Sequence, residues 1–241
     1  MWGHFIDLVL LFVLYSFGGW LFETTYASIS ERKFVNRGFL SGPFCPIYGF
    51  GAVIIIQTSA LLSHPLSKEP SLLFLAIILF ILLATILEYI TGFLMEKIFN
   101  CKWWDYSEEF LNLHGRICIK YSLLWGILAC ILISVIQPVV ALNISLLPEI
   151  YKNILAFILI GYFIFDTIKS SIDVLNLKQA VFAYCKHPVG KTHEQIIKHK
   201  RFFLAFPKLS FLYIGKMNQE IRGFLHDNFE KIKIQFKGRE I

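Results

Sequence analysis

Five stretches of mostly apolar residues dominate the chain, near residues 5–26, 46–62, 72–93, 117–142 and 154–175. A helix needs about 20 such residues to cross the hydrocarbon core of a bilayer. The whole chain is 56% hydrophobic and only 17% charged. This composition excludes an ordinary soluble domain, and the pattern predicts an all-α integral membrane protein of about five transmembrane helices.

The positive charge lies mainly in the last part of the chain. From Lys178 onward there are 13 Lys and Arg residues against 5 Asp and Glu residues, whereas the formal net charge of the whole chain is only +6. We therefore expect a transmembrane bundle over residues 1–177 and a basic cytoplasmic tail over residues 178–241. The capping pattern Thr-His-Glu-Gln at residues 192–195 predicts a short helix in that tail. Its expected partner is anionic membrane lipid and not nucleic acid, since no nucleic-acid motif accompanies it.

The connections between the apolar stretches differ in their content of Lys and Arg. Two of them are rich in basic residues, and they contain Arg32, Lys33, Arg37, Lys97, Lys102, Arg116 and Lys120. The alternate connections contain only Lys68 and Lys152. Basic connections stay on the cytoplasmic side, so the sequence predicts a multi-pass protein of the cell membrane with its N-terminus outside and its C-terminus inside.

Several charged residues fall within or beside the apolar stretches, where each costs roughly 2.5–3.5 kcal/mol on insertion scales. With the predicted topology they gather in the cytoplasmic half of the bundle. We expect them to form one polar cavity that opens to the cytoplasm, built from Glu23, Arg37, Glu88, Glu96, Asp105, Arg116, Asp166 and Asp173. The alternative is that Glu–Arg pairs only pin helix ends at the headgroups.

The entry to the second stretch is rich in residues that break helices. Between residues 36 and 51 it contains four glycines and two prolines. Irregular backbone at membrane depth requires protein or a watery cavity to satisfy its polar groups, so we expect a re-entrant or broken segment beside the acidic residues. It includes Gly42, Pro43, Cys45, Pro46, Tyr48 and Gly49. A plain loop followed by a helix that begins at proline is the alternative.

The two basic hairpins also show a faint internal repeat. Each has a helix with an acidic residue near its end, then Asn and Arg in the loop, then an aromatic residue followed by glycine. The corresponding residues are Glu23, Asn36, Arg37 and Tyr48-Gly49 in the first hairpin, and Glu96, Asn112, Arg116 and Trp125-Gly126 in the second. Such a duplication is typical of parallel-repeat transporters.

Several motifs resemble those of a bacterial membrane family described as putative ABC-transporter type IV, or CmpB-like. They are Gly-Trp-Leu-Phe-Glu at 19–23, the segment 36–49, Glu-Tyr-Ile-Thr-Gly at 88–92, Glu-Lys at 96–97, Trp-Trp-Asp-Tyr-Ser at 103–107 and Gly-Arg-Ile-Cys at 115–118. The resemblance implies a permease-type membrane component served by a separate ATPase. It implies no substrate and no catalytic residue. The chain has no Gx4GK[ST] loop, so any ATPase must be a partner.

These observations favour a transport component whose acidic cavity binds a cation, a cationic solute or a lipid headgroup. Five helices are few for a permease, so such a component would act as a homo-oligomer or with a second membrane subunit. A membrane-embedded enzyme acting on a lipid-linked phosphate is the first alternative, with carboxylates as acid and base or as ligands of a divalent cation. A scaffold or assembly subunit is the second. No cofactor is identified from the sequence.

Overall fold

The computed structural model describes residues 2–66, 70–186, 190–212, 214 and 223. Its elements, in chain order, are α1 (Trp2–Glu31), α2 (Pro46–Leu66), α3 (Pro70–Phe99), β1 (Cys101–Lys102), β2 (Asn112–Leu113), β3 (Ile117–Cys118), α4 (Ile119–Ile131), the π-helix η1 (Leu132–Ile136), α5 (Gln137–Ser145), α6 (Glu149–Lys186), α7 (Gly190–Lys198), α8 (Arg201–Ala205) and β4 (Ser210–Phe211). The strands pair only two by two, β1 with β4 and β2 with β3.

The long helices confirm the predicted all-α membrane fold. In the described part of the chain, α1, α3, the continuous helix of α4, η1 and α5, and α6 are long and apolar enough to cross a membrane. The apolar part of α2 is shorter, at residues 46–62. The number of helices that actually cross the membrane stays at the predicted five as an expectation.

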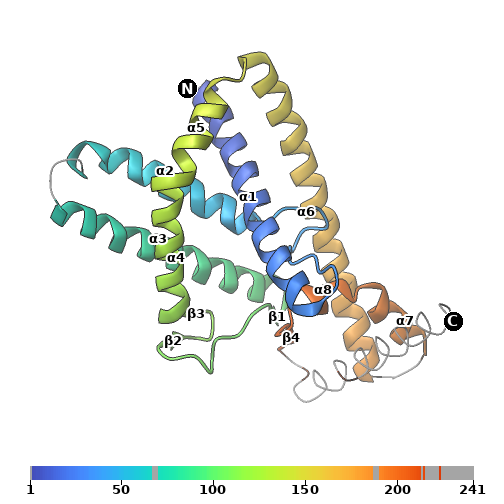
Figure 1. Cartoon of the computed structure of the whole chain (residues 1–241). Coiled ribbons are helices and arrows are strands. Elements are labelled where there is room, and N and C mark those ends of the chain that lie inside the picture. The colour runs from blue at the N-terminus through green and yellow to red at the C-terminus, as the bar shows by residue number, and fades with distance from the viewer. Residues whose placement is uncertain (1, 67–69, 187–189, 213, 215–222, 224–241) are drawn as a thin grey trace.

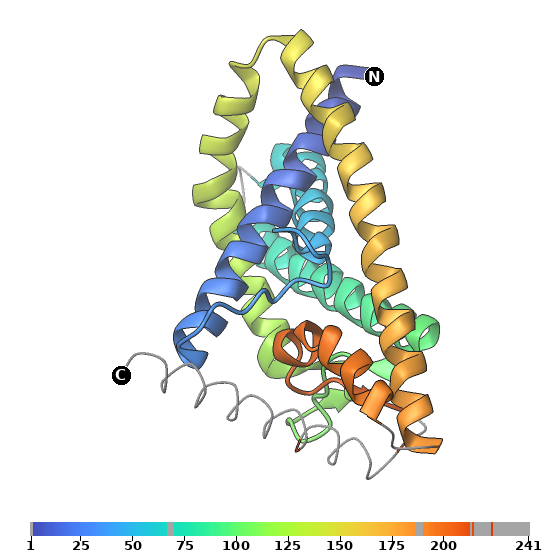
Figure 2. The ribbon, with the colours of Figure 1, turned by 90° about the vertical axis from the view of Figure 1, so that its right-hand side faces the viewer.

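Three of the long helices share one direction, and one hairpin crosses them. In Figures 1 and 2, α1, α4–α5 and α6 run along the length of the molecule, whereas α2 and α3 extend to the side as a hairpin. The N-terminus and the turn between α5 and α6 lie at the same end, where Lys152 forms ion pairs with Asp7 at 3.0 Å and Glu149 at 3.2 Å. The loop of residues 100–118 and helices α7 and α8 lie at the opposite end, which we call the basic end.

Helices α1 and α2 cross at a point where neither has room for a larger side chain. Gly19 of α1 lies against the ring of Tyr48, and Gly49 of α2 lies against Ser16 and the carbonyl of Phe12. Small residues let two helices approach closely, which raises the number of van der Waals contacts between them. These contacts fix the position along α1 at which α2 packs against it.

Residues 32–45 connect these two helices without forming a helix themselves. The Cys45 N–H donates a hydrogen bond of 2.9 Å to the carbonyl of Ser16. Ser16 lies about 22 Å along α1 from Glu31, at 1.5 Å per residue, so non-helical backbone extends deep beside the helix. The helix α2 then begins at Pro46, in keeping with the preference of proline for the first position of a helix. The re-entrant character of the segment remains a prediction.

Side chains satisfy much of the backbone in that segment. Asn36 accepts bonds from Trp20 at 2.8 Å and from the Gly38 N–H at 2.9 Å, and its amide donates to the carbonyl of Ser41 at 3.0 Å. At the middle of the segment, Arg201 of α8 donates to the carbonyls of residues 39 and 40. The segment is therefore held in place by both the bundle and the basic end.

The described part of the predicted tail packs against the bundle. The boundary expected after residue 177 falls inside α6, which continues to Lys186 without a break. Leu177, Val181, Ile196, Phe202 and Phe211 form one buried cluster with Phe99, Cys101 and Trp103 from α3 and the following loop. The short helix expected near residue 192 is present as α7, and Thr192 lies within it. The apolar residues Ile221, Phe224, Leu225, Ile232 and Phe236 recur at helical spacing and predict a second tail helix. These five residues lie outside the described ones.

The α1–α2 crossing gives a matched pair of glycine variants. Gly19→Ala places a methyl group against the Tyr48 ring, and we expect it to lower the free energy of unfolding by about 1–3 kcal/mol, the usual cost of overpacking. Gly18→Ala on the same helix meets nothing within 4 Å and should leave stability unchanged or slightly raised. Thermal unfolding in detergent measures both, and equal melting temperatures for the two variants would contradict the described crossing.

Candidate functional site

The eight polar residues expected in one cavity lie in several separate groups. Two of these groups are Glu–Arg pairs, Glu23 with Arg37 and Glu96 with Arg116. Asp105, Asp166, Asp173 and Glu88 each have a different set of neighbours.

Glu23 contacts both the irregular segment that follows α1 and the helix α2. Its carboxylate accepts a hydrogen bond from the Tyr48 hydroxyl at 2.8 Å and lies 3.4 Å from Arg37 Nε. Arg37 also donates to the backbone carbonyl of Ala205 in α8. The guanidinium is thus shared between α1 and the tail.

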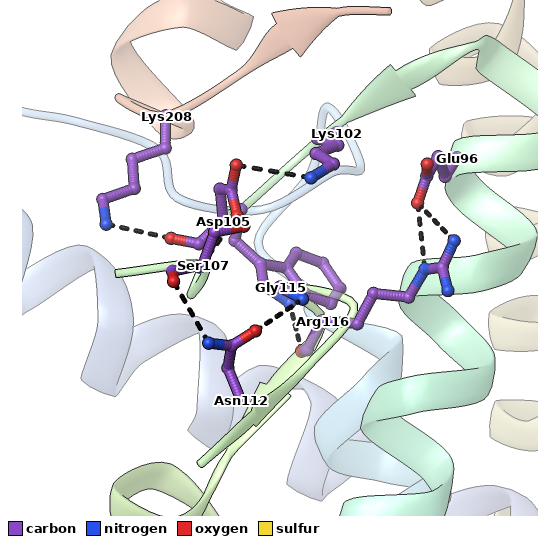
Figure 3. Close-up of polar contacts among 9 residues, drawn as sticks. Glu96, Lys102, Asp105, Ser107, Asn112, Gly115, Arg116 and Lys208 are labelled. Atoms are coloured by element: carbon purple, nitrogen blue, oxygen red, sulfur yellow. Dashed lines mark hydrogen bonds and ion pairs between the residues drawn. The ribbon is translucent and has the colours of Figure 1, made fainter. Parts of the chain in front are cut away.

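Glu96 holds the second arginine in a tighter pair (Figure 3). Its Oε2 atom lies 2.8 Å from Arg116 Nη2 and 2.9 Å from Arg116 Nε. The guanidinium also donates to the Tyr89 hydroxyl at 3.2 Å and lies over the rings of Tyr89 and Phe93. Both charged side chains are 17% exposed, so the pair is largely removed from water.

Asp105 belongs to the loop of residues 100–118, also drawn in Figure 3. It accepts bonds from the backbone N–H and hydroxyl of Ser107 and from Lys102, the last at 3.4 Å. Burial raises the pKa of Asp105, but these hydrogen bonds and the Lys102 charge outweigh it and hold the pKa below its usual value. A side chain at Gly115 would collide with Asp105, and its φ of +68° favours glycine. Asp105 therefore stabilises its own loop.

Asp166 of α6 binds the irregular segment. It accepts hydrogen bonds from the N–H groups of Ser41 at 3.1 Å and Gly42 at 2.9 Å, and Ser170 one turn later accepts a second bond from the Ser41 N–H. Asp166 is 3% exposed. Its charge is therefore used to satisfy backbone donors.

Asp173, farther along α6, lies near His199 and Arg201 of the basic end. Burial lowers the pKa of His199 and of Arg201, and the negative charge of Asp173 opposes this effect at both residues. Asp173 thus favours the charged form of Arg201 and has no part in the Glu–Arg pairs.

Glu88 of α3 resembles Asp166 in its burial and in its uncharged donors, but both of its donors are side chains and not backbone N–H groups. It is 4% exposed and accepts hydrogen bonds from Trp125 Nε1 at 3.0 Å and from the Tyr106 hydroxyl at 3.3 Å. Both donors are uncharged, and none of the ion pairs found among the described residues includes Glu88. A buried carboxylate without a cationic partner is costly, so it is a candidate functional group.

A cavity of about 420 Å³ lies beside Glu88. Apart from Glu88 and the aromatic residues Tyr15, Tyr48 and Trp125, its walls are almost entirely apolar or glycine. The lining comes from α1, α2, α3, α4, η1 and α5 and includes Leu14, Phe17, Gly18, Phe22, Ala52, Ile55, Ala84, Leu87, Leu128 and Ile136. Of the eight predicted residues, Glu88 alone lines this cavity. Among the described residues, no group of three or more His, Cys, Asp or Glu side chains is placed to hold a metal ion.

Comparison with known families matches residues 10–171 to a model described as putative ABC-transporter type IV. The chain belongs to that family. No curated protein matches the chain. No solved structure matches it either. The matched region of the family includes Glu88, Trp125 and the whole irregular segment, and it stops within α6 before the described tail.

Two helical hairpins, α1–α2 and α3–α4, correspond to each other in this chain. In each, an aromatic residue of the second helix donates to a glutamate of the first. Tyr48 of α2 donates to Glu23 of α1, and Trp125 of α4 donates to Glu88 of α3. The two aromatic rings meet each other edge to face, with centroids 5.3 Å apart. The cavity therefore lies where the two hairpins meet.

The glycine after each aromatic residue extends the correspondence. Gly49 lies against Ser16, and Gly126 lies against Ile81. Ser16 and Ile81 each precede the glutamate of their helix by seven residues. The repeat in the sequence pairs Glu23 with Glu96, whereas by these contacts the counterpart of Glu23 is Glu88.

The different surroundings of the glutamates predict different effects on stability. Glu96→Gln leaves the largely buried Arg116 without its carboxylate, and we expect a loss of roughly 3 kcal/mol, toward the lower end for a broken buried pair. Glu88→Gln keeps an acceptor for at least one of its donors and should cost no more than about 1 kcal/mol. Thermal unfolding of the two variants in the same detergent tests this, and a larger loss for Glu88→Gln would assign Glu88 a structural role.

Proposed function

We propose that the protein is the membrane component of a transport system and that the cavity beside Glu88 is its substrate site. The observation that carries the proposal is a buried carboxylate which faces a cavity and pairs with uncharged donors only. The other acidic residues of the predicted cavity have structural partners. A charge that the fold does not use for pairing is available to meet an incoming group.

The family and the sequence support a division of labour between this chain and an ATPase. The family is described as ABC-transporter type IV, and the chain contains no Gx4GK[ST] loop of its own. We infer that ATP hydrolysis is supplied by a separate subunit. We also infer that two copies of the chain, or this chain and a second membrane subunit, form the complete transporter.

The described contacts favour transport over the enzymatic alternative. An enzyme acting on a lipid-linked phosphate would use Arg37 and Arg116 to hold the phosphate. Both guanidinium groups are already occupied, Arg37 by Glu23 and a backbone carbonyl and Arg116 by Glu96 and Tyr89. The scaffold alternative gives no reason for a cavity at an unpaired carboxylate.

We infer that the basic end faces the cytoplasm and the N-terminus faces outward, because the basic connections gather at that end. A membrane-impermeant thiol reagent applied to intact cells should label a cysteine introduced at Ser145 and not one introduced at Lys33. The unmodified chain supplies the background from its own cysteines, and permeabilised cells show that position 33 can react. Labelling of position 33 in intact cells would reverse the orientation.

Native mass spectrometry tests the substrate site even while the substrate is unidentified. The protein purified from its host membrane in a mild detergent should carry a bound molecule of defined mass. Gly18 lines the cavity and a Cβ there would meet nothing within 4 Å, so Gly18→Leu should narrow the cavity with little strain on the backbone and should remove the bound mass. Gly161→Leu on α6, where a Cβ likewise meets nothing within 4 Å and which lies outside the cavity lining, should retain it.

Reconstitution of the wild type with the molecule so identified separates the functional classes. Transport predicts that it moves across the vesicle membrane with unchanged mass, whereas a changed mass would establish an enzyme. If Gly18→Leu and Gly161→Leu carry the same bound mass, the cavity is not the substrate site and the proposal fails.

A further inference from the structure

We propose, on the basis of the transport function above, that the cavity binds an amphiphile with a single cationic group, and that this group pairs with Glu88 while the apolar part lies along the cavity wall. The cation would be an ammonium or a guanidinium group. Three independent features of the described residues lead to this assignment.

The first feature is the difference between the two hairpins. Glu23 and Glu88 occupy corresponding positions and each accepts a bond from an aromatic donor of the next helix. In the first hairpin the loop arginine, Arg37, also reaches the glutamate. In the second hairpin the loop arginine, Arg116, pairs with Glu96 instead. A ligand cation at Glu88 would therefore supply the charge that Arg37 supplies at Glu23.

The second feature is the aromatic surface around Glu88. Trp125 and Tyr48 both line the cavity and meet edge to face, and Trp125 donates directly to the carboxylate. Aromatic faces attract cations, and the attraction reaches about 2 kcal/mol where water is excluded. A carboxylate beside a tryptophan and a tyrosine is a suitable binding site for a substituted ammonium group. Such a group is larger than a metal ion and can contact the aromatic rings and the carboxylate together.

The third feature is the apolar wall and its connection with the outer surface of the bundle. Leu14, Phe17, Phe22 and Ile136 line the cavity, yet their exposed fractions lie between 40% and 61%. In a membrane, residues exposed in this way contact lipid chains. The cavity therefore continues into the lipid-facing surface, and its volume of about 420 Å³ lies within the usual range for small-molecule sites. An amphiphile could enter sideways from the bilayer.

Three short amphiphiles with the same chain test the charge preference. Octyltrimethylammonium, octanol and octyl sulfate are titrated into the purified full-length protein in an uncharged detergent, and bound ligand is measured by native mass spectrometry. We expect octyltrimethylammonium to bind best. Glu88→Gln should weaken its binding at least about tenfold and leave octanol unaffected, because only the cation loses a charged partner.

The controls separate charge at the cavity from charge elsewhere and from loss of folding. Glu31→Gln removes one negative charge at an exposed site on α1 and should leave binding unchanged. Gly18→Leu should abolish binding of both octyltrimethylammonium and octanol, and Gly161→Leu should retain both. The melting temperature of every variant is measured in the same detergent, and binding is compared only between variants whose melting temperatures agree with that of the wild type.

Three results would overturn the inference. If octanol binds as tightly as octyltrimethylammonium and Gly18→Leu removes both, the cavity accepts apolar chains without selecting charge. The cationic assignment is then wrong, whereas the proposal that the cavity is the substrate site still stands. If octyl sulfate binds best, the cationic assignment is wrong. If none of the three binds, the cationic amphiphile is excluded, and the native mass of the Gly18→Leu protein decides separately whether the cavity holds any substrate.

Discussion

The backbone of residues 32–45 is not helical and must find hydrogen-bond partners in other parts of the protein, and much of the structure is arranged to supply them. A helix satisfies its own N–H and C=O groups, but this segment is not helical. Asp166 and Ser170 on α6 receive its N–H groups, Asn36 closes its turn, and Arg201 on α8 binds its carbonyls. Two distant parts of the chain, α6 and α8, are therefore fixed relative to each other by one irregular segment.

The same constraint explains why most charges in the bundle have defined structural roles. An ion taken out of water is tolerated only where hydrogen bonds or an opposite charge replace its hydration. Arg37 and Arg116 are each bound by a glutamate and by a further acceptor. Asp166 and Glu88 have uncharged partners only, but Asp166 holds the backbone of the irregular segment, whereas Glu88 is bound by an indole and a phenol and lines the cavity. This contrast, and not the number of charges, distinguishes Glu88 from the other acidic residues.

The helices could be predicted from the sequence because apolar length is a local signal. Each expected stretch coincides with a described helix, although the last helix extends through the boundary expected at residue 177. Which polar residues contact one another could not be predicted, since the spacing of residues along one helix does not reveal which loop packs against it. Glu96 and Glu88 lie on the same side of α3 by spacing, yet one meets Arg116 and the other meets Trp125. The pairing of Tyr106 with Glu88 left no signal in the sequence, whereas the repeated aromatic–glycine pair pointed to Trp125.

The two donors to Glu88 are anchored very differently. Trp125 is part of a long helix, whereas Tyr106 belongs to a loop that is tied down by its bond to Gly115, by Lys208 on the Asp105 carbonyl and by the two-residue pairing of β1 with β4. The hydrogen bonding of a carboxylate inside the bundle is thus linked to the chain beyond α8 through Lys208 and the loop of Tyr106. This link adds to the one that runs from Ala205 through Arg37 to Glu23.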